Sequence, residues 1–199
     1  MNVTFTHKDF NSSDGMMTSI WGPPLWHFLH TMSFNYPCKP TKHDKKHYKN
    51  FIQYLRHILP CKYCRNNLSN NLTQSGYSDK IFKNRASFSK WVYTLHETVN
   101  KMLGKKSSLT FTQVKHRYEQ FRSRCIDKEH VNMIKSVAIE KGCITPFYGT
   151  KTKCVMEIVP KRSNRKTFNI NSSCEVKRKS KTKSKRRSKI KSKRKSKRT

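Results

Sequence analysis

The chain has 199 residues, with 44 Lys and Arg against 11 Asp and Glu, and a formal net charge of +33. This length suits one globular domain of ordinary size with an appendage, and the charge favours an acidic partner such as nucleic acid or an anionic surface. No apolar run approaches the roughly 20 residues that a membrane-spanning helix requires, and residues 1–17 lack the apolar core of a secretory signal. We therefore expect a cytoplasmic protein without a membrane span.

The periodicity of the apolar residues predicts a bundle of helices. After a loose polar arm over residues 1–17, we expect five helices, which begin near Thr18, Thr41, Cys61, Arg85 and Thr112 and reach residues 36, 59, 72, 103 and 122. Pro23 and Pro24 fit the first turn of the first helix, where a missing N–H costs nothing. Gly104 is a good C-cap for the fourth helix. Together these helices predict an all-α fold.

The character of the chain changes after Cys125. Residues 127–141 fit one more helix, and residues 142–160 are typical of a β-hairpin with its turn near Gly149. Residues 175–199 hold 15 of the 44 basic residues in a Lys/Arg/Ser repeat, which cannot bury enough apolar surface to fold alone. We expect four regions, namely a flexible N-terminal arm (1–17), a helical domain (18–125), a small α/β extension (126–174) and a disordered basic tail (175–199).

The most informative motif is the CxxC of Cys61 and Cys64, directly after the helix-breaking Pro60. At the start of a helix, two cysteines at this spacing are poised for thiol–disulfide exchange. The helix N-terminus favours the thiolate, and the two intervening residues let one sulfur close onto the other. A structural zinc site normally needs two such pairs, and the sequence has no second CxxC, so no metal is expected.

Three further fragments surround this motif. WGPPLW-x3-H precedes it, while W-x4-H-x3-N and then a Lys-rich turn with an Arg-Tyr pair follow it. In this order and near this spacing, the fragments resemble the Erv/ALR family of FAD-linked sulfhydryl oxidases, and most of all the members encoded by large DNA viruses. The resemblance covers residues 20–125 and implies a four-helix bundle in which a short fifth helix helps to hold FAD.

The resemblance also implies roles for the matched residues. Cys61 would be attacked by the thiolate of a protein dithiol substrate, and Cys64 would pass the electrons to the flavin, which gives them to molecular oxygen to form hydrogen peroxide. It further implies a homodimer that packs the first two helices of each bundle together. The residues that it places at FAD are Gly22, Pro23, Trp26, His30, Trp91, His96, Asn100, Lys101, Lys105, Arg117 and Tyr118.

The spacing of these residues is compatible with a flat cofactor. Trp26 and His30 are four residues apart and share a helix face, as do His96 and Asn100, so the two faces can sandwich a ring system. The cationic side chains suit a pyrophosphate or the ribose–adenine end, namely Lys101, Lys105 and Arg117. Other interpretations stay open, because the histidines and tryptophans also fit a packed core and the lysines also fit a solvated helix end.

The remaining features leave two further expectations. Cys143 and Cys154 bracket the expected hairpin, so we expect a disulfide between them, either structural or a shuttle that relays electrons to the CxxC. The competing class is a basic protein that binds or packages nucleic acid, in which the CxxC is structural and the tail neutralises phosphates. If the chain is viral, the oxidase would act on virion proteins, in the host cytoplasm or the virion.

Overall fold

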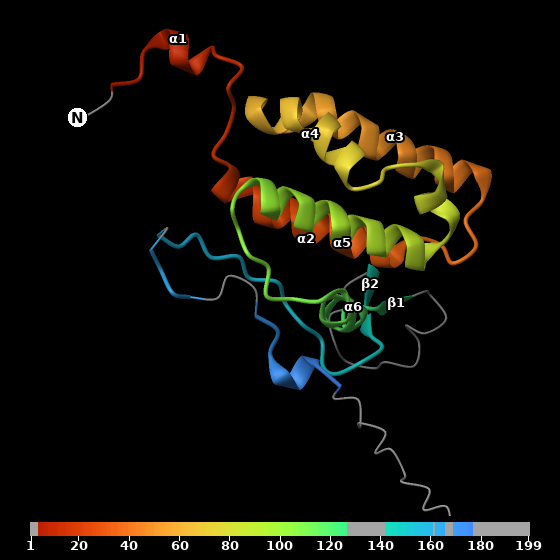
Figure 1. The fold of residues 1–199 in the computed structure, drawn as a ribbon. Coiled ribbons are helices and arrows are strands. Elements are labelled where there is room, and N and C mark those ends of the chain that lie inside the picture. Colours follow the sequence, from red (N-terminus) through yellow and green to blue (C-terminus); the bar gives the residue numbers. More distant parts are fainter. Residues whose placement is uncertain (1–3, 127–141, 161, 166–168, 177–199) are drawn as a thin grey trace, which may run out of the picture.

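The computed structural model describes residues 4–126, 142–160, 162–165 and 169–176, and these form a helical bundle with a small sheet beside it (Figure 1). The helices are α1 (His7–Phe10), α2 (Thr18–Asn35), α3 (Lys42–Ile58), α4 (Lys62–Gln74), α5 (Arg85–Met102) and α6 (Phe111–Glu119). Short 3-10 helices span Asp79–Lys83 and Ser172–Cys174, and the strands are β1 (Ser123–Ile126) and β2 (Gly142–Pro146). None of the described helices is long and apolar enough to cross a membrane.

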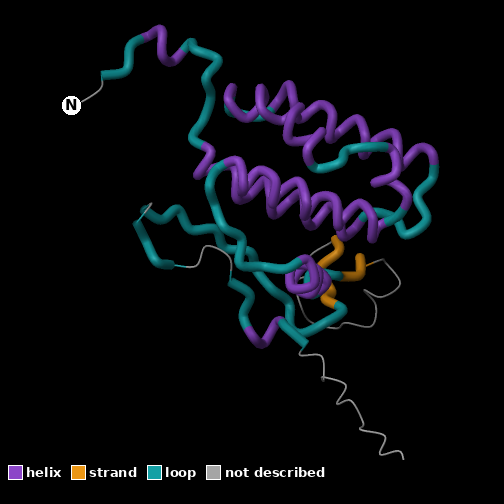
Figure 2. The backbone as a smooth tube through the Cα atoms, viewed as in Figure 1, coloured by secondary structure: helices purple, strands orange, loops and turns teal. Residues whose placement is uncertain are grey.

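The bundle consists of two helix pairs, and a fifth helix packs against α2. Helix α2 packs along α5, α3 packs on α4, and α4 closes the bundle against α5. Figure 2 shows these four helices as one group, and α6, viewed almost along its axis, lies beneath α2 and α5. The expected all-α bundle with a short fifth helix is therefore confirmed, while the short α1 was not expected.

An aromatic cluster forms the centre of the core. The ring of Phe88 is fully buried and lies 4.9–5.8 Å from the rings of Tyr36, Tyr48, Phe82 and Trp91. The Tyr36 hydroxyl donates to the carbonyl of Phe82 at 2.9 Å, so this buried polar group is satisfied. Rings from α2, α3 and α5 thereby hold these helices in register, which fixes the frame of the site.

Capping residues explain where helix α3 begins and where helix α5 ends. Thr41 and Asp44 form a capping box at the start of α3. At the end of α5, Gly104 takes a φ of 66°, and the amide of Lys105 donates to the carbonyl of Asn100 at 2.8 Å. This confirms Gly104 as the C-cap, because that backbone region strongly favours glycine.

The position of the proline pair in α2 corrects one expectation. Because α2 already begins at Thr18, Pro23 and Pro24 lie in its second turn rather than its first. Neither proline has an N–H, so the carbonyls of Ser19 and Ile20 lose their ordinary helical donors. The helix nevertheless continues to Asn35 and ends at Tyr36, as expected from the following proline.

The C-terminal extension differs from the expected hairpin. Strand β2 pairs antiparallel with β1 instead of with residues 151–160, which contain no strand. This pairing places Cys143 beside Cys125, and the two form a disulfide, while Cys154 is exposed and free. The expected Cys143–Cys154 disulfide is therefore wrong. The expected helix over 127–141 lies outside the described residues.

Candidate active site

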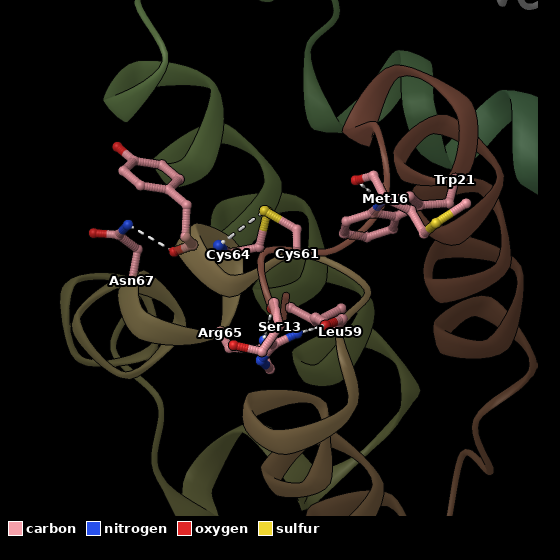
Figure 3. The surroundings of a disulfide bond; sticks show 9 residues. Ser13, Met16, Trp21, Leu59, Cys61, Cys64, Arg65 and Asn67 are labelled. Atoms are coloured by element: carbon pink, nitrogen blue, oxygen red, sulfur yellow. Dashed lines mark hydrogen bonds between the residues drawn. A yellow bond between two sulfur atoms is a disulfide. The ribbon is translucent and has the colours of Figure 1, made fainter. Parts of the chain in front are cut away.

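The redox-competent pair sits at the N-terminus of α4. Cys61 is the N-cap residue, Cys64 lies in the first turn, and the two form a disulfide (Figure 3). The amide of Cys64 donates to Sγ of Cys61 at 3.2 Å. This donor and the positive end of the helix dipole stabilise negative charge on Cys61, whereas Cys64 packs against the hydrophobic core. Cys61 is therefore suited to be the leaving thiolate, and Cys64 faces the interior.

The end of the N-terminal arm is bound directly to this pair. Gly15 forms an antiparallel bridge with Cys61, in which the amide of Met16 donates to the Pro60 carbonyl at 2.6 Å and the amide of Lys62 to the Asp14 carbonyl at 2.8 Å. The Arg65 guanidinium ties both sides together by donating to the carbonyls of Ser13 and Leu59. The expectation of a loose arm is thus wrong for residues 13–16.

Only glycine fits at the centre of this bridge. Gly15 has a φ of +101°, and a Cβ there would lie 2.5 Å from the Pro60 carbonyl oxygen. The sequence suggested only a turn at this point, because nothing local indicates that residue 15 meets residue 61. The bridge fixes the backbone on the N-terminal side of the disulfide.

Gly15→Ala is expected to release the arm and to lower the free energy of unfolding by about 2 kcal/mol, since it adds a clash to a strained φ. Gly76→Ala is the matched control, because Gly76 also has a positive φ, of +73°, but open space around it. It should cost only about 1 kcal/mol. Thermal unfolding and limited proteolysis of the arm measure both variants, and equal effects would contradict the bridge.

A second cluster joins α2, α5 and α6. Nε2 of His30 lies 3.1 Å from Nδ1 of His96, the ring of Trp26 stacks on that of His96 at 4.0 Å, and the ring of Tyr118 stacks on His30 at 5.1 Å. The Tyr118 hydroxyl also lies 3.2 Å from Nδ1 of His27. Four of the expected cofactor residues are therefore brought together by three helices.

Both histidines of this cluster are held neutral. The pKa of His30 is lowered to about 3, chiefly by burial and also by the neighbouring His96 and His27. Burial also lowers the pKa of His96 to about 4, with a contribution from the charge of Lys105. A hydrogen bond between two neutral imidazoles needs one donor and one acceptor nitrogen. The tautomer of one histidine therefore determines which nitrogen of the other carries the proton. Among the described atoms, Nδ1 of His30 is buried and has no hydrogen-bond partner.

The two helix faces meet directly. Trp26 stacks on His96 and His30 bonds to His96, so the two faces are in contact, and the expected sandwich of a flat cofactor between them stays a prediction. The hydrophobic core that Cys64 packs against also receives Trp26, so the cluster and the disulfide border one core.

The other expected residues are dispersed around this cluster. Trp91 is 4% exposed and lies in the core, where Nε1 donates to Oγ of Ser75 at 3.2 Å, so its contact with a cofactor stays a prediction. Nδ2 of Asn100 donates to Oε1 of Glu97 at 3.3 Å. The remaining expected residues lie at or near the surface, with Gly22 and Arg117 half-buried and Pro23, Lys101 and Lys105 exposed. His27 was missed, because nothing in its sequence context indicates its contact with Tyr118.

Comparisons with known proteins show which proteins this chain is similar to. A sequence model described as the Erv1 / Alr family matches residues 23–119. The chain is 35% identical over 91 residues to a probable FAD-linked sulfhydryl oxidase, R368, of Acanthamoeba polyphaga mimivirus, covering 46% of this chain and 64% of that protein. It is 30% identical over 100 residues to an FAD-linked sulfhydryl oxidase of African swine fever virus, covering 50% of this chain and 81% of that protein.

One further relative and one solved structure show how much of the chain is similar to known proteins. FAD-linked sulfhydryl oxidase ERV1 of Arabidopsis thaliana is 36% identical over 88 residues, which are 42% of each chain. The chain thus spans less than two thirds of the mimivirus and Arabidopsis proteins. A crystal structure of the yeast Erv1 core superposes with a TM-score of 0.47 at 25% identity, covering 53% of this chain and 86% of that one.

Proposed function

The chain belongs to the Erv1/Alr family, and on that premise we propose that it is an FAD-dependent thiol oxidase, which forms disulfide bonds in protein substrates. The observation that carries the proposal is the Cys61–Cys64 disulfide at the N-terminus of α4, within the part of the chain that matches the family. Relatives described as FAD-linked sulfhydryl oxidases support the same activity.

The disulfide accepts electrons by two exchange steps. A substrate thiolate attacks Sγ of Cys61, so the Cys61–Cys64 bond breaks and Cys64 leaves as a thiolate. The second substrate thiolate then attacks the substrate sulfur of the mixed disulfide, and Cys61 leaves as a thiolate. The amide of Cys64 and the helix N-terminus stabilise that leaving group. The substrate has lost two electrons and two protons, and the pair holds two thiols.

The residues of the His30 cluster fit FAD. Nδ1 of His30 is buried without a partner among the described atoms, and the aromatic rings around it give a ring system an apolar surface. Bound FAD supplies the two-electron acceptor that restores the disulfide and reduces molecular oxygen to hydrogen peroxide. The residues proposed to hold it are Gly22, Pro23, Trp26, His30, Trp91, His96, Asn100, Lys101, Lys105, Arg117 and Tyr118.

These residues would contact different parts of the cofactor, according to their charge and hydrogen-bonding groups. Neutral imidazoles orient polar groups without adding charge to the buried cluster, and their low pKa values keep them neutral at physiological pH. The exposed Lys101 and Lys105 at the end of α5 suit the phosphates. The rings of Trp26 on α2 and Tyr118 on α6 lie beside His30, which is buried.

The proposal is tested on the purified chain of 199 residues. A yellow protein with the visible spectrum of a bound flavin, which takes up oxygen and forms hydrogen peroxide when dithiothreitol is added, is the expected result. A colourless protein that takes up no oxygen after reconstitution with FAD would overturn the proposal. The competing class, a basic packaging protein with a structural CxxC, would then be favoured if that protein bound DNA.

A homodimer is proposed from the exposed apolar surface of α2 and α3. Phe28 is 51% and Tyr54 60% exposed, and the ring of Phe28 lies 6.0 Å from that of Phe51, so the apolar side chains of both helices form one surface. Apolar surface of this kind is what a dimer would bury. Sedimentation of the wild type against Phe28→Ser/Tyr54→Ser should show a dimer only in the wild type.

The basic tail is proposed to bind an anionic partner such as nucleic acid. The cytoplasm stays the predicted compartment of the protein. Deleting residues 177–199 removes 15 of the 44 Lys and Arg. We expect at least a tenfold loss of DNA affinity and a shallower dependence on salt, because fewer counterions are released, with dithiothreitol oxidation intact. Fluorescence titration of labelled DNA at several salt concentrations measures this. Unchanged affinity would contradict the proposal.

A further inference from the structure

An apolar hollow lies directly beside the redox disulfide. Its volume is about 310 Å³, and its lining is formed by Met16, Met17, Ile20, Trp21 and Pro60. We call it the Pro60 hollow. Met16 is 70%, Met17 67% and Ile20 42% exposed, which is unusual for large apolar side chains that sit together. The hollow is therefore an open apolar surface, outside the His30 cluster.

The walls of the hollow are fixed in place. One wall is the end of the arm, which the bridge between Gly15 and Cys61 holds against Pro60. The other wall is the start of α2, and Nε1 of Trp21 donates to the carbonyl of Met16 at 3.1 Å, which joins the two walls. Figure 3 shows Met16 and Trp21 together on one side of the disulfide. The hollow is thus a built feature rather than a gap between mobile segments.

The position of the hollow determines what can occupy it. Pro60 is the residue immediately before Cys61, the sulfur that a substrate thiolate attacks in the proposed reaction. Consecutive Cα atoms are about 3.8 Å apart, so residues next to a substrate cysteine must lie over the surface that borders Cys61. A polar side chain would lose its water there, because the lining is almost entirely apolar. A large apolar side chain would instead be stabilised by burial.

We propose that the Pro60 hollow is a docking site for a large apolar residue that neighbours the reactive cysteine of a protein substrate. This inference rests on the proposed function and names its substrate class, namely dithiol segments in which leucine, isoleucine, phenylalanine or methionine adjoins the cysteine. The arm then has a role in substrate selection, because it supplies Met16 and holds it next to Cys61.

The first test compares two dithiol peptides that differ only in the residue before the first cysteine, leucine or serine. In the wild type, kcat/KM for oxygen uptake should favour the leucine peptide by about tenfold or more. In Met16→Ser/Ile20→Ser this ratio should fall to near one. Phe10→Ser is the matched control, because Phe10 is an exposed apolar residue of the same arm outside the hollow, and it should keep the wild-type ratio.

A second measurement does not use the cofactor. Each peptide, with its second cysteine replaced by serine, is supplied as a mixed disulfide with thionitrobenzoate. In Cys64→Ser the Cys61 thiolate attacks the peptide sulfur, so a Cys61–peptide disulfide forms and the coloured thionitrobenzoate leaves. Cys61→Ser/Cys64→Ser gives the background from the other cysteines. The leucine peptide should react about tenfold faster, and the hollow variants should abolish this preference.

The outcomes separate this inference from the proposed function. Equal reactivity of the two peptides in the exchange assay, or a preference that persists in Met16→Ser/Ile20→Ser, would overturn the docking site even in an active oxidase. A preference seen in the exchange assay with no oxygen uptake by the wild type would support the docking site and overturn the oxidase. A loss of preference in Phe10→Ser as well would overturn the hollow as its cause.

Discussion

Cys64→Ser is expected to lower dithiothreitol oxidation by at least about 1,000-fold, as when one member of a catalytic pair that acts as a unit is removed. Without Cys64, Cys61 has no internal partner, so the chain cannot form the disulfide that takes two electrons from a substrate. A substrate thiol would also have no Cys64 thiolate to displace. Oxygen uptake with dithiothreitol measures the loss.

The substitution should leave the fold and the cofactor in place. Serine is nearly the size of cysteine, and the aromatic core around Phe88 does not depend on the disulfide. The visible flavin spectrum and the thermal midpoint should therefore stay close to those of the wild type. Cys38→Ser is the matched control, because Cys38 is exposed and free, and it should retain full activity.

Residual activity in Cys64→Ser would have a specific meaning. The described residues contain one other disulfide, Cys125–Cys143, which lies between β1 and β2. Turnover within a few fold of the wild type would show that this second pair or another thiol reaches the electron acceptor directly. That result would contradict the role assigned to α4.

The local features of the fold could be predicted from the sequence. The apolar periodicity of α3 and α5, the proline after Tyr36 and the glycine at position 104 each act within a few residues, so the helices were located within one or two residues at most ends. The CxxC was predictable for the same reason, because two cysteines and a helix start are enough to define it.

The errors have a common physical cause, which is pairing between distant segments. Strand β2 alternates well enough to suggest a hairpin, but its partner is β1 and not the residues that follow it. The cysteine pairing follows from that sheet, and so Cys143 meets Cys125. Gly15 meets Cys61 across 46 residues, and no local pattern reports such a contact.

In the candidate site, too, local features could be predicted from the sequence and contacts between distant segments could not. The spacing of Trp26 and His30 correctly placed them on one helix face, since residues four apart are neighbours. Whether that face touches the face of His96 depends on how closely α2 and α5 pack, which side-chain spacing does not determine. The core position of Trp91 likewise follows from its contact with Ser75, which comes from a different part of the bundle.

Acid is expected to destabilise the protein steeply between about pH 6.5 and pH 4, through the buried pair of His30 and His96. In the unfolded chain both histidines bind a proton near their ordinary pKa, whereas in the folded chain the pKa values are about 3 and about 4. Above about pH 6.5 both histidines are neutral in the folded and the unfolded chain, so the pair does not lower the free energy of unfolding there. The free energy of unfolding decreases as the pH falls towards the folded pKa values, by about 1.4 kcal/mol per pH unit for each histidine.

Unfolding in urea at several pH values measures this loss, which should amount to several kcal/mol between pH 6 and pH 4. The variant His96→Gln removes one proton-binding group and should roughly halve the slope. The matched control is His43→Gln, because His43 and His47 also form an imidazole pair, at 2.9 Å, but on the exposed side of α3. Because acid also increases repulsion in so basic a chain, the difference in slope between the variants isolates the buried pair. Equal slopes in the wild type and His96→Gln would show that His96 is already charged in the folded protein, and the neutral pair at the centre of the proposed cofactor site would have to be abandoned.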